Sequence, residues 1–448
     1  MTQRDSSERT NGWAVGIIGV ACCLAMLSSV RTVLAADKIA GGKNNAPPVV
    51  VDYTINLDTI TSGFDGKTCW VAPRAGIVPG ATPSVVVTMQ KLLLVGSDVF
   101  YAVNEVRTDD LGKSWSPPLE HAQTLGRRFE PNGIEIVVGD FTPQWHAHSG
   151  KLLGTGPTVR YKKNAAGAEV KISQNEASSR PAYATYDPQQ RTWTAWETIV
   201  MPDDPKFFYA TVGASQRVDL ANGEILLPFH FKTAGESPYH TAVMRCSFDG
   251  KKLAYVEHGD ELKRPVEAGV EYKLPGGRQT GVFEPSLARY RGRYYLTMRN
   301  DRAAYMATSD DGLHFGPVER WRFDDGGDLG SRNTQQHWVT HSDGLFLVYT
   351  RVGANNDHVF RNRAPLFIAQ VDPEKRHVIR STERILIPER GAGLGNAFGV
   401  TKVNEHETWV TTAEWMQGPK GILMPGNPYG SDNSVYAARI LWKSPNRE

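Results

Sequence analysis

Short runs of apolar and β-branched residues, separated by turn residues, recur along the chain after residue 46. Runs of this kind with Gly, Pro, Asn or Asp between them are typical of β-strands and tight turns. In the clearest stretch, Gly281–Phe315, the turn Arg291-Gly292 separates two such runs and a third follows; the runs are Leu287–Tyr290, Tyr294–Met298 and Ala303–Ala307. Long helical periodicity is missing, and 43 Gly and 27 Pro are present. The pattern predicts an all-β fold.

One turn pattern recurs between these runs. Thr108–Trp115 and Thr308–Phe315 both fit Ser/Thr-x-Asp-x-Gly-x-x-Trp/Phe, and two eroded copies begin at Thr185 and Ser247. In such a sequence the hydroxyl and carboxylate bond to nearby backbone N–H groups, while Gly takes a conformation that other residues resist. The aromatic ring then packs under the turn. Recurrence at intervals of roughly 60–80 residues predicts one turn reused in several four-stranded sheets.

This turn resembles the Asp-box, or BNR repeat, of the sialidase (neuraminidase) superfamily. The resemblance implies an all-β, six-bladed β-propeller of the sialidase-like type. No linker is evident after Ala46, so we expect a single β-propeller domain over residues 47–448. The segment Lys162–Arg180 is polar and rich in Ala, Ser and Lys, which predicts an exposed insertion loop.

The first residues have the pattern of a targeting segment. Arg4 and Arg9 precede an apolar run from Trp13 to Met26, and small residues suited to cleavage follow at 33–36. We therefore expect residues 1–36 to be a signal peptide and residues 37–46 a flexible lead-in. This predicts a secreted or periplasmic protein with no stable membrane partner beyond the export signal. An uncleaved membrane anchor is the alternative interpretation.

Charge and cysteine content exclude some classes of partner. The formal net charge is +2, whereas nucleic-acid-binding proteins normally carry a basic surface. No nucleic-acid partner is therefore expected. Beyond the predicted signal peptide only Cys69 and Cys246 remain, and the sequence leaves open whether they form a disulfide or are two buried thiols. No CxxC pair suggests a zinc site, and no cofactor is expected.

Several charged residues match the order of catalytic features in the sialidase superfamily. Arg74, within Trp70–Pro79, looks like a loosened version of the family's Arg-Ile-Pro opening, and Asp98 follows 24 residues later. Glu284 precedes Arg299 by 15 residues, and the second turn motif comes next. The resemblance implies that Asp98 is the acid/base and that Glu284 assists the nucleophile or water.

The third arginine of the pattern is expected at the start of a later strand. Arg361 and Arg363 precede the run Ala364–Gln370, and Arg363 fits slightly better. The resemblance implies that these arginines, with Arg74 and Arg299, clamp a substrate carboxylate. Arginine suits this role because its planar fork makes charge-assisted, often bidentate hydrogen bonds.

The family's nucleophilic tyrosine has no counterpart in this pattern. The segment Gly391–Val403 contains Phe398 and no tyrosine. Three interpretations are open: another residue is the nucleophile, the enzyme inverts configuration by using water, or the activity is lost. Tyr305, Asp357 and His358 are the candidates from elsewhere in the chain.

Histidine-bearing stretches lie outside the sialidase pattern. His337 and His358 are candidates for substrate contacts, and His146 and His148 have the i, i+2 spacing that places two ligands on one face of a strand. Loop or surface histidines are the simpler interpretation, and no metal site is predicted. Trp338 and Trp415 are either core aromatics or platforms for a sugar ring.

Three functions are compatible with these features. The first is an exported sialidase-like exo-glycoside hydrolase that removes a terminal, acidic sugar from a glycan. The second is a polysaccharide lyase on uronic-acid glycans, with His146, His148, His337 or His358 as the base. The third is a non-catalytic carbohydrate-binding propeller, since fold alone does not settle function. All three predict a glycan or polysaccharide as the partner.

Overall fold

The computed structural model describes residues 50–94, 98–235, 238–267 and 281–448. The predicted signal peptide and lead-in, and residues 47–49 of the predicted domain, lie outside these ranges. In the described part of the chain, every regular element except four short 3₁₀ turns is a strand, and no helix is long and apolar enough to cross a membrane.

The first three sheets are formed by consecutive parts of the chain. Sheet 1 contains β2 (Thr68–Val78), β3 (Ser84–Leu94), β4 (Asp98–Thr108) and β5 (Leu119–Glu120). Sheet 2 contains β8 (Thr142–His146), β9 (Lys151–Lys163), β11 (Pro181–Asp187), β12 (Thr192–Trp193) and β13 (Glu197–Thr198), extended by β6 (Arg128–Glu130), β7 (Ile134–Val138) and β10 (Glu169–Lys171). Sheet 3 contains β14 (Tyr209–Thr211), β15 (Val218–Asp219), β16 (Ile225–Lys232), β17 (His240–Phe248) and β18 (Leu253–His258).

The other three sheets complete the ring. Sheet 4 contains β19 (Phe283–Tyr290), β20 (Arg293–Arg299), β21 (Tyr305–Ser309) and β22 (Glu319–Arg320). Sheet 5 contains β23 (His337–His341), β24 (Gly344–Tyr349), β25 (Leu366–Asp372), β26 (His377–Val378) and β27 (Arg384–Ile387). Sheet 6 contains β28 (Gly399–Lys402), β29 (Glu407–Ala413), β32 (Val435–Trp442) and β1 (Tyr53–Thr61), and β30 (Gln417–Gly418) pairs with β31 (Gly421–Ile422) outside it.

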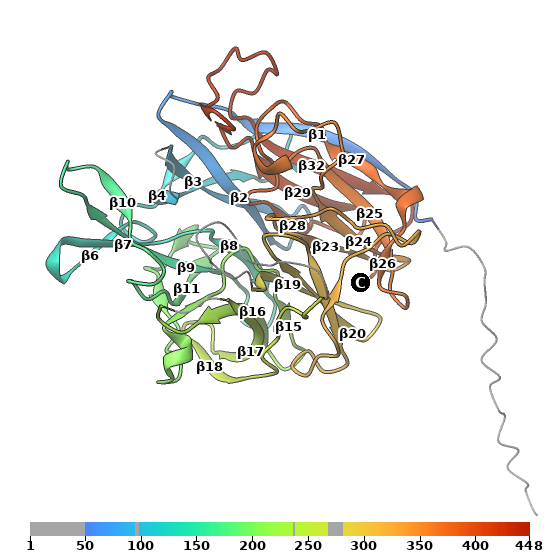
Figure 1. Ribbon diagram of the computed structural model, residues 1–448, viewed down its shortest axis with the longest axis horizontal. Helices are drawn as coiled ribbons and strands as arrows, with labels where there is room; N and C mark the ends of the chain where they lie inside the picture. The colour runs from blue at the N-terminus through green and yellow to red at the C-terminus, as the bar shows by residue number, and fades with distance from the viewer. Residues whose placement is uncertain (1–49, 95–97, 236–237, 268–280) are drawn as a thin grey trace, which may run out of the picture. The chain divides into compact units, whose positions relative to one another are not determined.

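The ring closes by pairing the two ends of the described chain. β1 pairs antiparallel with β32, with Tyr53 opposite Trp442, and Figure 1 shows the two strands side by side. The inner strand β2 of sheet 1 packs against β8 of sheet 2 and β28 of sheet 6, and β23 lies between β19 and β28. The six sheets therefore form a propeller, and seven apolar clusters fill the spaces within and between them.

The predicted strands and turn of Gly281–Phe315 are confirmed. β19 ends at Tyr290, β20 begins at Arg293, and β21 follows at Tyr305. The turn between β19 and β20 places Arg291 and Gly292 at positive φ, the conformation in which glycine carries the smallest steric cost.

The two full turn motifs form the expected hydrogen bonds. In the first, Gly112 N–H donates to Thr108 Oγ1 at 2.9 Å and Ser114 N–H to Asp110 Oδ1 at 2.9 Å. In the second, Ser309 Oγ accepts from Gly312 N–H and Asp311 Oδ1 accepts from His314 N–H. These two residues lie one position after Thr308 and Asp310, which the sequence pattern indicated. In both turns the glycine has a φ of about 80°, as the positive-φ prediction requires.

Gly312→Ala should destabilise the protein by about 1–2 kcal/mol, because the residue would be held in the left-handed region. Its φ is +82°, and an added Cβ would also lie 2.5 Å from Leu226 Cδ1. Thermal unfolding of the variant checks this. Gly316→Ala is the control, since the nearest atom to its Cβ would be 3.7 Å away. Equal melting temperatures for the two variants would contradict the prediction.

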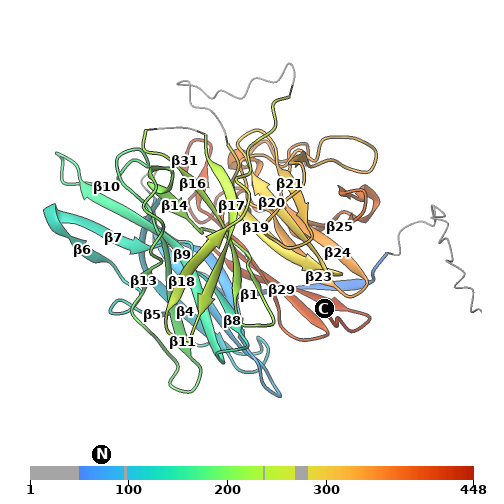
Figure 2. The same ribbon diagram turned by 90° about the horizontal axis from the view of Figure 1, so that it is seen from below.

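The prediction of a plain exposed loop at Lys162–Arg180 is wrong. Residues Glu169–Lys171 form β10, which pairs with the end of β9, and Figure 2 shows β6, β7 and β10 extending beyond the rest of sheet 2. The segment has the polar composition of a loop because β10 has only one strand partner. The polar composition gives no indication that Lys171 points inward, where its ammonium pairs with Asp98.

Candidate active site

A cavity of about 370 Å³ lies where the inner strands begin, and we call it the upper cavity. Asp140 lies two residues before β8, Glu284 is the second residue of β19, and Asn333 and Asn396 lie shortly before β23 and β28. Because the inner strands of a propeller run in one direction, their first residues meet at one end of the ring. Five of the predicted site residues also line the cavity, namely Asp98, Glu284, Arg299, Arg361 and Arg363.

Four cavity-lining residues other than glycine adopt positive φ. They are Asp140 (φ 45°), Glu284 (45°), Asn333 (52°) and Arg361 (60°). Glu284 also lies in an irregularity of the β19–β20 pairing, which turns its side chain away from the regular alternation. Strained backbone persists where the surrounding structure enforces it and gathers at functional sites, so these positions favour a ligand-binding role for the cavity.

Asp98 is paired with a lysine that sequence analysis missed. Lys171 Nζ lies 2.8 Å from Asp98 Oδ2. The Lys171 charge holds the pKa of the Asp98 carboxyl below its usual range. The backbone is fixed as well, since Tyr161 OH donates to the Asp98 carbonyl at 3.0 Å. Asp98 is therefore an ionised group in this site, which does not suit a proton donor.

Glu284 and Arg299 form an ion pair. Arg299 Nη1 lies 2.6 Å from Glu284 Oε2. Burial opposes ionisation of Glu284, but the Arg299 guanidinium outweighs it, and the pKa of Glu284 is lowered. Asn333 Oδ1 accepts a hydrogen bond from Arg299 Nη2 at 2.5 Å, while Arg299 Nε has no hydrogen-bond partner in the part of the chain that the structure describes.

Arg363 is a buried cation without a carboxylate partner in the described part of the chain. Its side chain donates Nε–H and Nη2–H to the Asn333 carbonyl, at 3.0 and 2.6 Å. Burial, and then the neighbouring Arg299 and Arg361 guanidiniums, hold its pKa well below the usual value. A buried charge without a counterion is costly. The pair Arg299 and Arg363 therefore forms a place where an anion would be stabilised.

Asp140 is the one of these three carboxylates whose pKa is raised. Burial raises its pKa, and the negative charges of Glu284 and Asp98 add to the effect, although Arg74 opposes it. Asp140 was missed by sequence analysis because it belongs to no motif, and it follows the strand-like run Ile134–Val138 as an ordinary turn residue would.

Arg74 lies behind the cavity rather than in its wall. Its guanidinium donates to Asp140 Oδ1, Gln335 Oε1 and the Phe398 carbonyl at 3.2, 3.3 and 3.2 Å. The side chain is 1% exposed. Arg74 thus meets the carboxylate of Asp140, and it does not stand beside Arg299 and Arg363 among the lining residues.

The two predicted histidines lie outside the upper cavity. His337 is buried on β23, where Nδ1 lies 2.9 Å from Ser286 Oγ and the ring packs against Phe398. His358 pairs with Glu389 at 3.0 Å and stacks on Tyr429. Trp338 is a core aromatic that donates to the Ser286 carbonyl.

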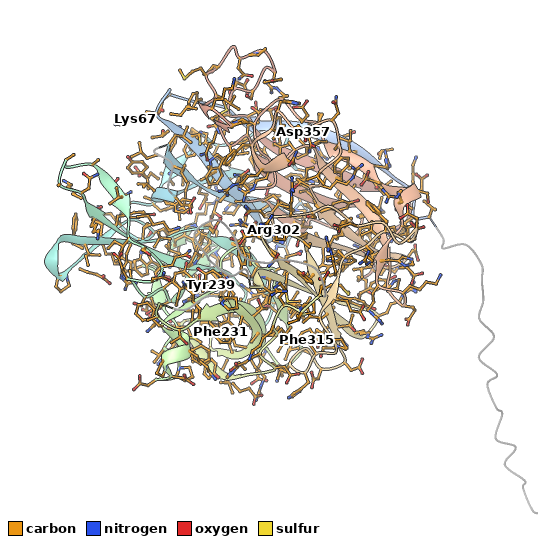
Figure 3. The ribbon with its side chains drawn as sticks, in the orientation of Figure 1. Lys67, Phe231, Tyr239, Arg302, Phe315 and Asp357 are labelled. Carbon is orange, nitrogen blue, oxygen red and sulfur yellow. The ribbon has the colours of Figure 1, made fainter. Side chains whose placement is uncertain are left out.

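An aromatic wall from sheet 3 was also missed by sequence analysis. Tyr209, His230 and Tyr239 line the cavity, and the His230 ring lies 5.1 Å from the Tyr239 ring. Tyr239 is labelled in Figure 3. The Gln174 amide donates to Tyr209 OH at 3.2 Å, and its oxygen accepts from Tyr239 OH. These residues lie in different strands and loops, so no local sequence signal joins them.

Trp415 is the predicted aromatic that does line the cavity. Among the described residues, Trp415 Nε1 and Asn396 Oδ1 are buried and have no hydrogen-bond partner, and the same holds for Thr211 Oγ1. Together with Arg299 Nε, these make four unpaired polar atoms on residues around one cavity. Unpaired buried polar atoms are uncommon in native proteins and call for a specific explanation, and a polar ligand provides one.

Structural roles account for His146 and for the two cysteines singled out in the sequence. His146 is buried and bonds to Ser149 Oγ and the Gly223 carbonyl. Cys69 and Cys246 are free, buried thiols in different apolar clusters, and burial raises the pKa of each to about 12. No group of three metal-ligating side chains was found among the residues that the structure describes.

Lys171→Met should raise the pKa of Asp98 to its ordinary value of about 4 or above, because the largest cause of the lowering is removed. Carboxyl-carbon NMR of labelled protein measures this pKa directly. The control is Lys162→Met, which removes an exposed lysine that pairs with Glu176 at 3.5 Å. An unchanged Asp98 pKa would show that Lys171 is not its effective counterion.

No protein-family model matches the sequence, and no curated protein matches it. Solved structures do match. The NanB sialidase of Streptococcus pneumoniae is 12% identical, with 86% of this chain and 70% of that chain covered and a TM-score of 0.57. A Trypanosoma rangeli sialidase is 12% identical over 86% of this chain, with a TM-score of 0.51, and the match spans 59% of that longer protein.

A third match is close to this chain in extent. The intramolecular trans-sialidase from Ruminococcus gnavus is 11% identical, and the match covers 86% of this chain and 97% of that one with a TM-score of 0.51. At this identity the likeness concerns the fold. The predicted architecture is confirmed: the chain is an all-β propeller of six sheets with the fold of the sialidases.

Proposed function

We propose that this protein is a glycoside hydrolase that removes a terminal acidic sugar from a glycan. The observation that carries the proposal is Arg363, a buried arginine without a carboxylate partner among the described residues, beside Arg299 and Arg361 in the upper cavity. A sugar carboxylate supplies the missing anion, and arginine binds it through charge-assisted hydrogen bonds.

Different carboxylates of the upper cavity act as the proton donor and as the base. Environments that push carboxyl pKa values apart separate a proton donor from an ionised partner. Asp140, whose pKa is raised, is the proton donor to the leaving oxygen, and Glu284, whose pKa is lowered, is the base. Asp98, expected from the sequence to be the acid/base, instead stays ionised beside Lys171 and stabilises positive charge at the anomeric carbon.

Water is the proposed nucleophile. Among the residues that the structure describes, the tyrosines lining the cavity are Tyr209 and Tyr239, and both are bound to Gln174. Burial raises the pKa of Tyr209, which disfavours a phenolate. Activation of water by Glu284 predicts inversion at the anomeric carbon.

A lyase is supported less well by the same cavity. His230 is its lining histidine in the described chain, and burial lowers its pKa to about 4, so the ring is neutral. Its Nδ1 accepts a hydrogen bond from Glu284 N–H at 3.2 Å. The proton therefore sits on Nε2, and His230 offers a donor where a lyase needs a base.

The test is activity of the full chain on sialylated and uronic-acid-containing glycans, with Glu284→Gln beside it. A free acidic sugar released by the wild type and not by the variant supports the proposal. An unsaturated, ultraviolet-absorbing product would replace it with the lyase, and binding without any product would replace it with a binding propeller. The pH profile is a second check. Activity should fall as pH rises through the Asp140 pKa and as pH falls through the Glu284 pKa.

Export remains part of the proposal. A glycan-degrading enzyme acts on substrates outside the cell, which fits the signal peptide predicted at residues 1–36. N-terminal sequencing of the protein recovered outside the cytoplasm checks it. A mature chain that still begins at Met1 would contradict cleavage.

A further inference from the structure

A second cavity, of about 520 Å³, lies where the inner strands end, and we call it the lower cavity. Trp145 near the end of β8, Arg289 near the end of β19 and Lys402 at the end of β28 line it. It is separated from the upper cavity by the buried side chains of Arg74 and His337, which line the lower cavity while Arg74 bonds to Asp140 of the upper one. None of the proposed acid and base groups reaches it.

The floor of the lower cavity is held in one arrangement by hydrogen bonds between sheets. Gln216 Oε1 accepts from Trp338 N–H at 2.7 Å and from Ser286 Oγ at 2.8 Å. Because the single hydroxyl hydrogen of Ser286 goes to Gln216, the Ser286 oxygen accepts from His337 Nδ1–H at 2.9 Å. The tautomer of His337 is fixed in this way.

His337 therefore presents a bare acceptor at this floor. Burial lowers its pKa to about 3, although the Phe398 carbonyl beside the ring opposes this, so the ring is neutral. Within the described chain Nε2 is buried and makes no well-formed hydrogen bond, and the Phe398 carbonyl already accepts from Arg74 Nε. A hydroxyl group is the kind of ligand atom that satisfies such an acceptor.

The walls combine an aromatic ring with a free cation. Trp145 is partly exposed in the cavity, and Pro143 and Leu287 add apolar surface. Arg289 is exposed, its guanidinium lies over the Tyr294 ring at 5.9 Å, and no carboxylate of the described chain pairs with it. Two acidic residues also line the cavity. Asp219 is already engaged by Arg217 at 2.8 Å, and the backbone oxygen of Glu448 accepts from Lys402 Nζ, so neither forms an ion pair with Arg289.

We propose that the lower cavity is a second saccharide site, which binds a sugar residue carrying an anionic group and does not cleave it. The apolar face of a sugar ring packs on Trp145, its hydroxyls reach His337 and nearby amides, and its anionic group pairs with Arg289. A polymer held at this end stays attached while the upper cavity acts on a chain end. The lower cavity contains none of the groups proposed for hydrolysis, so binding there can be tested independently of hydrolysis.

Titration calorimetry of the full chain with hexasaccharides of hyaluronan and of polygalacturonate tests the proposal, with neutral cellohexaose as the comparison. Arg363→Met, which disables the upper cavity, should still bind an acidic hexasaccharide. Adding Arg289→Ala or Trp145→Ala to that variant should weaken the binding about 10-fold or more. Arg291→Ala and Phe129→Ala are the matched controls, since both residues are outside the lower cavity.

Two results would overturn the inference. One is the loss of all acidic hexasaccharide binding in Arg363→Met, which would leave a single site. The other is unchanged binding in Arg289→Ala, a substitution of an exposed side chain that should not disturb folding. Equal affinity for the neutral cellohexaose would show that the lower cavity does not recognise an anionic group. Hydrolysis at the upper cavity is measured in a separate assay, so a lack of hydrolysis is not mistaken for a lack of binding at the lower cavity.

Discussion

Asp140→Asn is expected to lower kcat on an acidic glycan about 10²- to 10⁴-fold, the range typical for loss of a general acid. The amide keeps the size of the side chain and its contact with Arg74, but it cannot donate an acidic proton to the leaving oxygen. The same variant should lose the alkaline limb of the pH profile, since that limb reports deprotonation of Asp140.

The leaving group separates catalysis from a general loss of structure. A substrate with an aryl leaving group of low pKa needs little protonation, so Asp140→Asn should retain far more activity on it than on a natural glycan. Asp98→Asn is the matched control, because it makes the same chemical change on a carboxylate that Lys171 keeps ionised. If Asp98→Asn shows the larger dependence on the leaving group, Asp98 is the acid and the assignment to Asp140 fails.

Local sequence patterns predicted the strands and turns whose structure depends on nearby residues. The alternation of apolar and turn residues placed β19, β20 and their turn, because strand burial and turn conformation are decided within a few residues. Glu284 and Arg299 meet in an ion pair because the two ends of this hairpin lie side by side.

The rest of the site depends on ring closure, which no short pattern encodes. Asp140 and Lys171 come from a turn and from a short strand of sheet 2, and only the packing of that sheet beside sheet 1 brings Lys171 to Asp98. Arg74 was placed by order and spacing alone, which cannot tell a side chain in the cavity wall from one behind it. The contact with Asp140 reveals that difference.

Arg363→Met is expected to make the protein more stable and to remove binding of acidic sugars at the upper cavity. Arg363 forms no ion pair in the described chain, and replacing it with an apolar side chain of similar length avoids the desolvation of its charge. Apolar replacement of buried ion pairs is often stabilising, by about 1–4 kcal/mol. The gain is reduced by loss of the two hydrogen bonds to the Asn333 carbonyl. The melting temperature of the ligand-free variant should therefore rise.

Ligand binding should change in the opposite direction. Loss of a buried, charge-assisted contact to the sugar carboxylate costs about 2–5 kcal/mol, which is a fall in affinity of roughly 30- to several-thousand-fold. In an Arg289→Ala background, which disables the lower cavity, an acidic sugar should raise the melting temperature of the protein and should leave that of the double variant Arg289→Ala/Arg363→Met unchanged. Arg361→Met is the neighbouring comparison. A less stable double variant that still binds the sugar would mean that Arg363 is structural and that it does not bind the substrate carboxylate.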